Sequence, residues 1–240
     1  MIAERYKKNL GSFVYPDMQE LMLDKTIAII GCGGNGGYVA EFLARFGVKK
    51  LLLWDGDTYC ESNLNRQVGC TMDTIGQNKA EVMKARVESI NPEIECHAKA
   101  WFFGEREMDL RQVLECDLIA WEADCCGRKE MAKSYATQAI ENGIPVLASP
   151  VTENGCQVSI FTKDSLNKFN QEVKNAGFIV GDCPDISQPA YSCAMAACLA
   201  VEHIIKYFAF EQCPVINQRL SYDVASDLTH RLDFEYGLLN

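Results

Sequence analysis

Short apolar runs alternate along this chain with segments that have the period of an amphipathic helix. The runs at 26–30, 50–54, 118–121 and 145–148 are nearly continuous, as strands buried on both faces are. Strands of more mixed pattern are predicted at 94–98 and 157–161, and helices at 35–46, 78–90, 107–115, 127–141 and 190–210. Such alternation favours a mostly parallel sheet with helices on both faces.

The C-terminal part of the chain has a different pattern. Short β-like pieces near 215–220 and 222–225 predict a small antiparallel addition at one edge of the sheet. No repeat, low-complexity tract or linker divides the sequence, so we expect a single domain over residues 1–240.

A glycine-rich segment joins the first strand to the first helix. Gly31-Cys-Gly33-Gly34-Asn-Gly36-Gly37 matches G-x-G-x-x-G in the strand–turn–helix context that this motif requires. Glycines let the backbone approach phosphates, and the helix N-terminus favours negative charge. Asp55 ends the second strand, where its carboxylate could accept hydrogen bonds from ribose hydroxyls. These features predict a nucleotide site in a Rossmann-like fold, but a purely structural turn, NAD and ATP all stay open.

The segment after the second strand separates NAD from ATP. It reads Asp55-Gly-Asp57-Thr-Tyr-Cys-Glu-Ser62-Asn63-Leu-Asn65-Arg66-Gln67, and Ile75-Gly-Gln-Asn-Lys79 follows. In this order and spacing the chain resembles the ThiF/MoeB-type adenylyltransferases over roughly residues 5–207. They belong to the superfamily of the ubiquitin-activating enzymes, which adenylate the C-terminal glycine of a small ubiquitin-like protein. The resemblance implies one adenylation domain, with a nucleotide-binding half at about 1–125 and a carrier-binding half at about 126–240.

Adenylation needs charge stabilisation more than it needs a protein nucleophile. A substrate carboxylate attacks the α-phosphorus of ATP and pyrophosphate leaves, so the protein must position the reactants and offset phosphate charge. The resemblance implies that Arg66 and Lys79 are the catalytic cations on the triphosphate, although each could instead be a solvated surface residue. The other nucleotide contacts that it implies are Gly31, Gly33, Gly34, Gly36, Asp55, Asp57, Ser62, Asn63 and Asn65.

Asp124 is the candidate metal ligand. It follows the strand predicted at 118–121, at the carboxyl end where open α/β sheets bind ligands, and it resembles the family's metal-binding aspartate. A carboxylate there could hold Mg²⁺ against the phosphates, whereas the alternative is a helix cap. Cys125 follows Asp124 where many relatives have asparagine. The twelve cysteines form no C-x-x-C pair, so we expect no zinc, unlike in many relatives.

Two further site residues are implied by the resemblance. Cys183, in Gly181-Asp-Cys183-Pro-Asp185, lies near the position where ThiF-like proteins keep a cysteine that links to the carrier protein. Its thiol could accept the acyl group as a thioester, or it could be an unreactive loop cysteine. Relatives often carry an N-terminal arginine that reaches the partner's ATP across a dimer. Lys8 stands here instead, and we expect a homodimer in which Lys8 has this role.

Several other residues suggest weaker hypotheses. His97, His203 and His230 share no spacing, which argues against a metal cluster. Trp101, Phe102 and Phe103 form an apolar cluster that indicates packing or a partner contact. Glu122 with Asp124 could form an acid–base pair of carboxylates, but beside an ATP motif a metal or structural role is favoured.

Charge and hydropathy bear on partners and location. Twenty-three Lys and Arg against 33 Asp and Glu give a net charge of −10, which disfavours nucleic acid and anionic membranes as partners. The first 25 residues show no signal or transit pattern, so we expect the cytoplasm. The apolar stretch at 190–201 is too short to span a bilayer and predicts a buried helix.

The sequence thus predicts an ATP- and Mg²⁺-dependent adenylyltransferase for the C-terminal glycine of a β-grasp ubiquitin-like or sulfur-carrier protein. One alternative keeps the adenylation but directs it to a carboxyl group on a modified tRNA nucleoside, which is then cyclised. Another is a nucleotide-binding partner subunit without catalysis. A nicotinamide dehydrogenase is the weakest alternative.

Overall fold

The computed structural model describes residues 3–9, 18–123, 129–152, 155–174, 188–209, 218–223, 228–233 and 237–238. Within these ranges one ten-stranded sheet has the order β10-β9-β8-β7-β5-β4-β1-β2-β3, and β6 pairs with β7. The strands are β1 (Thr26–Ile30), β2 (Lys50–Trp54), β3 (Glu95–Lys99), β4 (Leu118–Trp121), β5 (Val146–Ala148), β6 (Val151–Thr152), β7 (Gly155–Phe161), β8 (Gln218–Asp223), β9 (Leu228–Asp233) and β10 (Gly237–Leu238).

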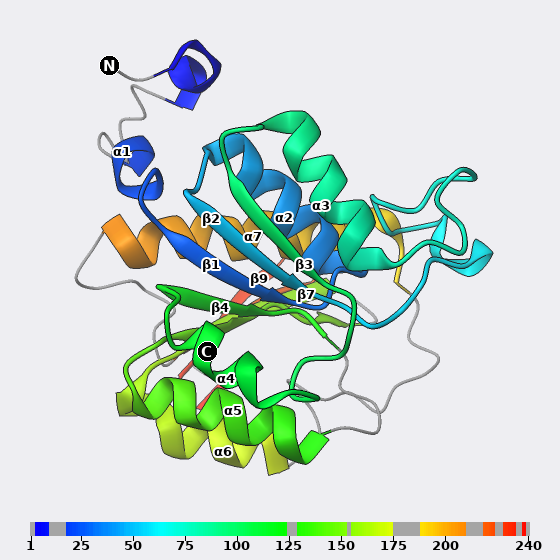
Figure 1. Cartoon of the computed structure of the whole chain (residues 1–240). Coiled ribbons are helices and arrows are strands. Elements are labelled where there is room, and N and C mark those ends of the chain that lie inside the picture. Colours follow the sequence, from blue (N-terminus) through cyan, green and yellow to red (C-terminus); the bar gives the residue numbers. More distant parts are fainter. Residues whose placement is uncertain are drawn as a thin grey trace.

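Helices cover both faces of this sheet (Figure 1). One face carries α2 (Gly34–Phe46), α3 (Lys79–Ile90) and α7 (Ala190–Ala209), and the other carries α4 (Glu107–Val113), α5 (Lys129–Glu141) and α6 (Leu166–Lys174). A short helix α1 (Met18–Met22) precedes β1, and short 3₁₀ helices lie at η1 (Glu4–Asn9), η2 (Glu61–Asn63) and η3 (Lys163–Ser165).

The central strands run in parallel, and β1 lies between β2 and β4. The chain moves from β1 to β2 and β3 on one side, and returns to β4 and β5 on the other. Strand order therefore reverses at β1, and the loops that follow β1, β2 and β4 meet at one edge of the sheet, where folds of this kind bind ligands. Beyond β5, the strands β7 to β10 are antiparallel. The predicted fold class, including the antiparallel C-terminal addition, is confirmed.

Most predicted elements lie where the sequence places them. The strands predicted at 26–30, 50–54 and 118–121 have those bounds, and α2 ends at Phe46, directly before the C-cap Gly47, whose φ of 73° is left-handed. The prediction of a separate strand at 222–225 is wrong for Tyr222 and Asp223. Both belong to β8, which pairs along its length with β9.

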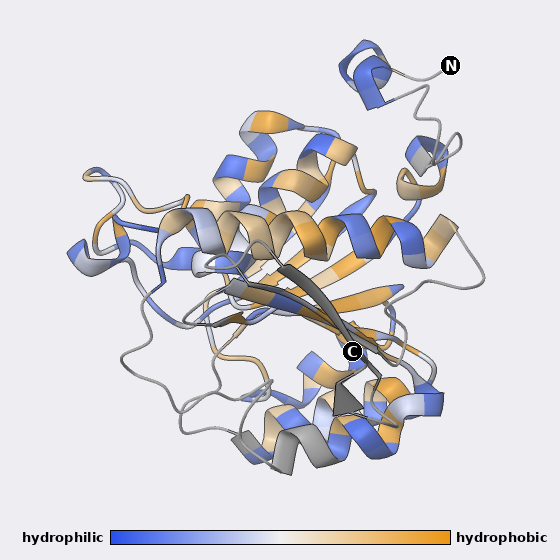
Figure 2. Ribbon diagram, turned by 180° about the vertical axis from the view of Figure 1, so that it is seen from behind, coloured by the Kyte–Doolittle hydropathy of each residue, from blue (hydrophilic) through white to orange (hydrophobic). Residues whose placement is uncertain are grey.

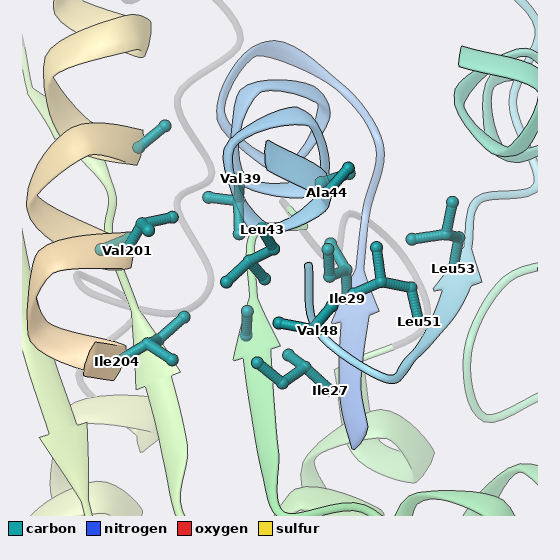
Figure 3. Close-up of a cluster of buried hydrophobic side chains, with 14 of the residues drawn as sticks. Ile27, Ile29, Val39, Leu43, Ala44, Val48, Leu51, Leu53, Val201 and Ile204 are labelled. Carbon is teal, nitrogen blue, oxygen red and sulfur yellow. The ribbon is translucent and has the colours of Figure 1, made fainter. Parts of the chain in front are cut away.

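The core forms two apolar layers, one on each face of the sheet. Alternate residues of a strand point to opposite faces, so Ile27 and Ile29 pack toward α2 and α7, whereas Ala28 and Ile30 pack toward α5. Figure 3 shows Ile27 and Ile29 beside Val39 and Leu43 of α2, with Val201 and Ile204 of α7 on the other side of this layer. In Figure 2 the central strands are mostly apolar, and the helices mix apolar and polar residues.

The long helix α7 belongs to this core. Among the described residues it is the one helix long and apolar enough to pass for a membrane span by length and composition. Its residues Cys193, Ala197, Ala200 and Ile204 are fully buried, and the helix packs against α2 and β7. We interpret α7 as a core helix, as the sequence predicts.

Glu41 of α2 connects this helix to α3 through Arg86, and it also pairs with Arg45 of its own helix. Its carboxylate accepts hydrogen bonds from Arg45 (Nη2, 2.7 Å) and Arg86 (Nε, 2.6 Å). Burial disfavours ionisation of Glu41, but these hydrogen bonds outweigh it and hold its pKa below the ordinary value. The helices that begin at the glycine loop and at Lys79 are therefore joined by a buried carboxylate.

We expect the Glu41→Gln variant to lose about 1–2 kcal/mol of unfolding free energy at pH 7, since it loses charged hydrogen bonds. Because the folded pKa of Glu41 lies below the unfolded value, its stabilisation is present above the unfolded pKa and is lost as pH falls. The difference between variant and wild type should shrink from pH 7 to pH 3 in urea unfolding. An equal difference at both pH values would contradict the ionic origin.

Candidate functional site

The glycine loop packs so closely that two of its positions exclude a side chain. Gly31 has φ +93°, and a Cβ there would lie 2.9 Å from the Ala123 backbone. A Cβ on Gly36 would overlap the carbonyl oxygen of Gly31. Gly33 is the N-cap of α2, and as a glycine it has no side chain that could cap the helix. The first N–H groups of α2 are therefore not capped by a side chain of Gly33. An anion site at a helix N-terminus requires N–H groups without such a cap.

Two glycine variants should separate packing from ligand approach. Gly36→Ala is expected to lower the unfolding free energy by about 3 kcal/mol, because backbone must move to admit the methyl group. Gly33→Ala should change it by less than about 1 kcal/mol, since its Cβ would only touch Gln67 at 3.6 Å. Urea unfolding measures both, and ATP titration of Gly33→Ala then reports on phosphate approach. Equal destabilisation of the two variants would contradict this packing.

Asp55 ties the end of β2 to the glycine loop. Its Oδ2 accepts a hydrogen bond from the Cys32 N–H (2.7 Å), and its Oδ1 accepts one from the Asp57 N–H (2.9 Å). Burial raises the pKa of the Asp55 carboxyl above its ordinary value, against the opposing effects of Lys79 and the two N–H donors. The structure therefore places Asp55 beside the loop, as the sequence predicts, and its contact with a ribose stays a prediction.

Lys79 begins α3 and is directed toward the same region. Its side chain is 11% exposed, and Nζ lies 3.3 Å from Oδ2 of Asp57. The preceding Asn78 caps α3 through Glu81 N–H (3.1 Å) and donates to the carbonyls of Asp55 (2.9 Å) and Asp57 (3.0 Å). The start of α3 is therefore fixed to the loop that carries both aspartates.

Arg66 is oriented by three neutral acceptors. Its Nη1 donates to the Ser62 carbonyl (3.0 Å) and to Oδ1 of Asn65 (2.8 Å), and its Nε donates to Oε1 of Gln188 (3.2 Å). Its Cγ lies 3.9 Å from the position of a Cβ on Gly34. Since all three acceptors are uncharged, they orient the guanidinium group without neutralising it, and the aliphatic stem of Arg66 lies at the start of α2.

Asn63 serves the loop rather than an open surface. Its side chain is buried and accepts a hydrogen bond from the Cys60 N–H (3.2 Å), and its carbonyl accepts from the Arg66 and Gln67 N–H groups. Ser62 is exposed, with its Oγ 3.1 Å from Sγ of Cys60. In this structure Ser62, Asn63 and Asn65 thus support Arg66, and their contact with a nucleotide stays a prediction.

Glu122 makes structural contacts in the folded chain. A structural role is one of the two roles that the sequence favours for this residue. Both of its carboxyl oxygens lie within hydrogen-bond distance of Ser149 Oγ (2.8 and 2.7 Å), and Asn35 is a further hydrogen-bond partner. Burial raises the pKa of Glu122 to about 8, and the hydrogen bonds from Ser149 and Asn35 only partly oppose it. The sequence analysis missed Asn35 and Ser149. The one available signal was a polar residue inside the glycine motif and another directly after an apolar strand.

Three of the residues singled out in the sequence lie outside the described part of the chain: Asp124, Cys125 and Cys183. Lys8 is described and is exposed on η1. This turn is held on its own chain by Tyr6, whose hydroxyl accepts a hydrogen bond from Asn91 Nδ2 (2.6 Å). The metal, acceptor and dimer roles therefore stay predictions.

The remaining side chains of interest make structural contacts. His97 pairs with Glu95 (2.7 Å), and His203 contacts the Leu199 carbonyl within α7 (2.7 Å). In the described ranges no group of three His, Cys, Asp or Glu side chains is placed to hold a metal. Trp101 donates to the buried Asp109 (3.0 Å), and Phe103 is in the core. Phe102 lies over Gly56 but is exposed, so a partner contact for it stays a prediction.

The family comparison covers almost the whole chain. The sequence profile of the ThiF family matches residues 6–236. Among solved structures, Escherichia coli MccB with ATP superimposes with a TM-score of 0.77 at 21% identity, over 97% of this chain and 72% of that one. At this identity the likeness shows the fold alone.

Two functional groups are represented among the curated relatives. The tRNA threonylcarbamoyladenosine dehydratase of Bacillus subtilis is 32% identical over 154 residues, which cover 64% of this chain and 59% of that protein. The sulfur carrier protein ThiS adenylyltransferase of Escherichia coli is 30% identical over 147 residues, or 61% of this chain and 57% of that protein. The matched stretches thus span less than two thirds of these relatives.

Proposed function

The chain belongs to the ThiF family, and from this premise we propose that it activates a substrate carboxylate with ATP, forming an acyl-adenylate and pyrophosphate. The observation that carries the proposal is the placement of two cations around one glycine loop. Lys79 is paired beside the aspartates at the end of β2, and Arg66 lies against the start of α2. The partners of Arg66 described above are uncharged, whereas Lys79 forms an ion pair with Asp57.

Each group has a distinct part in this proposal. The N–H groups at the start of α2 bind phosphate oxygens, and Asp55 orients the ribose. Arg66 and Lys79 stabilise the negative charge that moves onto the departing pyrophosphate while the carboxylate oxygen bonds to the α-phosphorus. Mg²⁺, when bound by Asp124, supplies further positive charge to the phosphates. The carboxylate is itself the nucleophile, so the site needs no general base for this step.

The comparisons favour a tRNA-borne carboxylate as the first substrate candidate. Dehydratases named for threonylcarbamoyladenosine are among the most similar relatives, with 44% identity over 84 residues for that of Haemophilus influenzae and 45% over 74 residues for that of Escherichia coli. Loss of water from a nucleoside carboxylic acid requires one carboxyl oxygen to become a leaving group. Adenylation turns that oxygen into part of the AMP leaving group. The same site therefore fits the tRNA-directed alternative that the sequence left open.

A carrier protein with a C-terminal glycine is the second candidate. The net charge of −10 disfavours a polyanionic substrate. Adenylyltransferases for the sulfur carrier ThiS and for molybdopterin synthase match about as much of the chain as the Bacillus subtilis dehydratase does. In this version a β-grasp carrier binds the half at about 126–240, and Cys183 accepts the acyl group as a thioester.

The remaining proposals concern assembly and location. We propose one adenylation unit over residues 1–240, a cytoplasmic homodimer, and a role for Lys8 at the partner's nucleotide site. ThiF membership disfavours the nicotinamide dehydrogenase. A partner subunit without catalysis predicts ATP binding with no pyrophosphate release.

ATP–pyrophosphate exchange with Mg²⁺ tests the proposal and separates the two substrates. One arm contains tRNA that carries threonylcarbamoyladenosine, and the other contains glycine-terminated β-grasp proteins. Matched controls are tRNA without the carboxylate and a carrier without its terminal glycine, and Asp124→Ala tests the metal ligand. Exchange in one arm, lost with its control, identifies the substrate class. ATP binding without exchange in either arm would contradict the activity and favour the partner-subunit alternative.

A further inference from the structure

A carboxyl group lies directly beneath the glycine loop, and the adenylation chemistry does not use it. Glu122 immediately follows β4, and its N–H donates to the Ile30 carbonyl at the end of β1 (2.8 Å). A Cβ on Gly36 would lie 3.2 Å from the Cβ of Glu122, so this residue packs against the first turn of α2.

Glu122 joins three segments that are far apart in the sequence. Its carboxyl group is hydrogen-bonded to Ser149, which follows β5 and is fully buried, and to Asn35 in the first turn of α2. Asn35 Nδ2 also donates to the Ser149 carbonyl (2.5 Å). Glu122, Asn35 and Ser149 thus form a closed network between the ends of β4 and β5 and the start of α2, to which Ser149 contributes both its hydroxyl group and its backbone carbonyl.

This network must compensate the cost of burying a carboxyl group, and it lies at the first turn of α2. Burial of a carboxyl group is unfavourable unless hydrogen bonds compensate it. Within the described residues, Oδ1 of Asn35 is buried without a hydrogen-bond partner, so the amide is held through its NH₂ group alone. Asn35 stands between Gly34 and Gly36, and glycines leave a backbone more conformational freedom than other residues do. Its side chain is therefore the group that can fix this turn.

We propose that Glu122 is a positioning residue for the nucleotide: through Asn35 and Ser149 it fixes the first turn of α2 so that its N–H groups face the triphosphate. This inference rests on the proposed function, because it takes ATP as the ligand. It adds Glu122, Asn35 and Ser149 to the proposed site as residues that contact no phosphate. They act only by fixing the glycine loop.

The test is direct titration of ATP, without an acyl substrate, into purified wild type and variants. Glu122→Ala and Asn35→Ala should each raise the Kd for ATP about tenfold, as expected when a buried hydrogen-bonding partner is lost. The double variant should be no weaker than either single one, because the residues act as a unit. Glu122→Gln keeps the shape and an acceptor oxygen and should stay within about threefold of wild type.

Asp117→Ala is the matched control, since Asp117 lies at the opposite end of β4 and accepts a hydrogen bond from Thr26 N–H (2.7 Å). It should lower the Tm and leave the Kd for ATP unchanged. A Glu122→Ala variant that behaves in the same way would overturn the inference and leave the proposed function standing. Wild type that binds no ATP would overturn both. Where Glu122→Ala does not fold, Asn35→Ala decides by the same criterion.

Discussion

Replacing Lys79 with alanine is expected to lower the rate of adenylate formation by about 10²–10³-fold, the usual cost of removing one preorganised group that stabilises developing charge. Lys79 is the first residue of α3, and its side chain is 11% exposed beside Asp57. Departing pyrophosphate gains negative charge at the reaction step, so loss of this cation should lower kcat more than it raises the KM for ATP.

Pyrophosphate exchange measures the effect, and far-UV circular dichroism with thermal unfolding checks the fold. Lys84→Ala is the control, because Lys84 lies on the same helix and pairs with Glu88 on the surface (3.3 Å). It should keep at least about half of the wild-type rate, as most exposed ion pairs contribute little. Equal rates in the Lys79 and Lys84 variants would show that Lys79 does not contribute to adenylation.

Arg66→Ala should lower adenylation by about 10²-fold or more. The guanidinium group is held by Ser62, Asn65 and Gln188, so its position is fixed before ATP binds. Arg66→Lys should recover only part of this loss. An ammonium group keeps the charge but cannot reproduce the planar set of donors that meets three acceptors.

The same exchange assay measures both Arg66 variants, with Arg111→Ala on α4 as the control for loss of an exposed arginine. Full activity in Arg66→Lys would mean that charge alone matters and that the observed orientation has no role. Near-wild-type rates in both Arg66→Ala and Lys79→Ala would contradict the assignment of these two residues to the phosphate site.

The parallel half of the fold follows from local sequence signals. Strands β1, β2 and β4 are buried on both faces, and continuous apolar runs are typical of such strands. Glycine after α2 and asparagine before α3 are common helix boundaries, and both have the expected geometry here.

The elements that were not predicted from the sequence depend on tertiary contacts instead. Helix α6 has a mostly polar sequence, and its Phe169 is buried against Phe161 of β7, with ring centroids 5.3 Å apart. Strand β9 alternates too weakly to be read alone, and it is a strand because it pairs with β8 and β10.

The candidate site shows the same division between local and distant information. The strand–turn–helix context predicted the glycine loop and Asp55 as parts of a nucleotide site, and the family resemblance added Arg66 and Lys79. The sequence did not predict that Gln188 would orient Arg66, a contact between residues 122 positions apart. Nor did it predict the contact of Asn35 with Ser149 across 114 positions. Each of these partners is an ordinary polar residue until the fold brings it to the loop.

Transfer of oxygen from substrate to AMP is the measurement that tests carboxylate adenylation most directly. The substrate identified by the exchange assay would be prepared with ¹⁸O in its carboxylate and turned over with ATP, and the released AMP analysed by mass spectrometry. Attack of the carboxylate on the α-phosphorus predicts AMP that carries one substrate oxygen, with unlabelled pyrophosphate. Label in inorganic phosphate, with ADP as the other product, would show attack at the γ-phosphorus and contradict the proposed function.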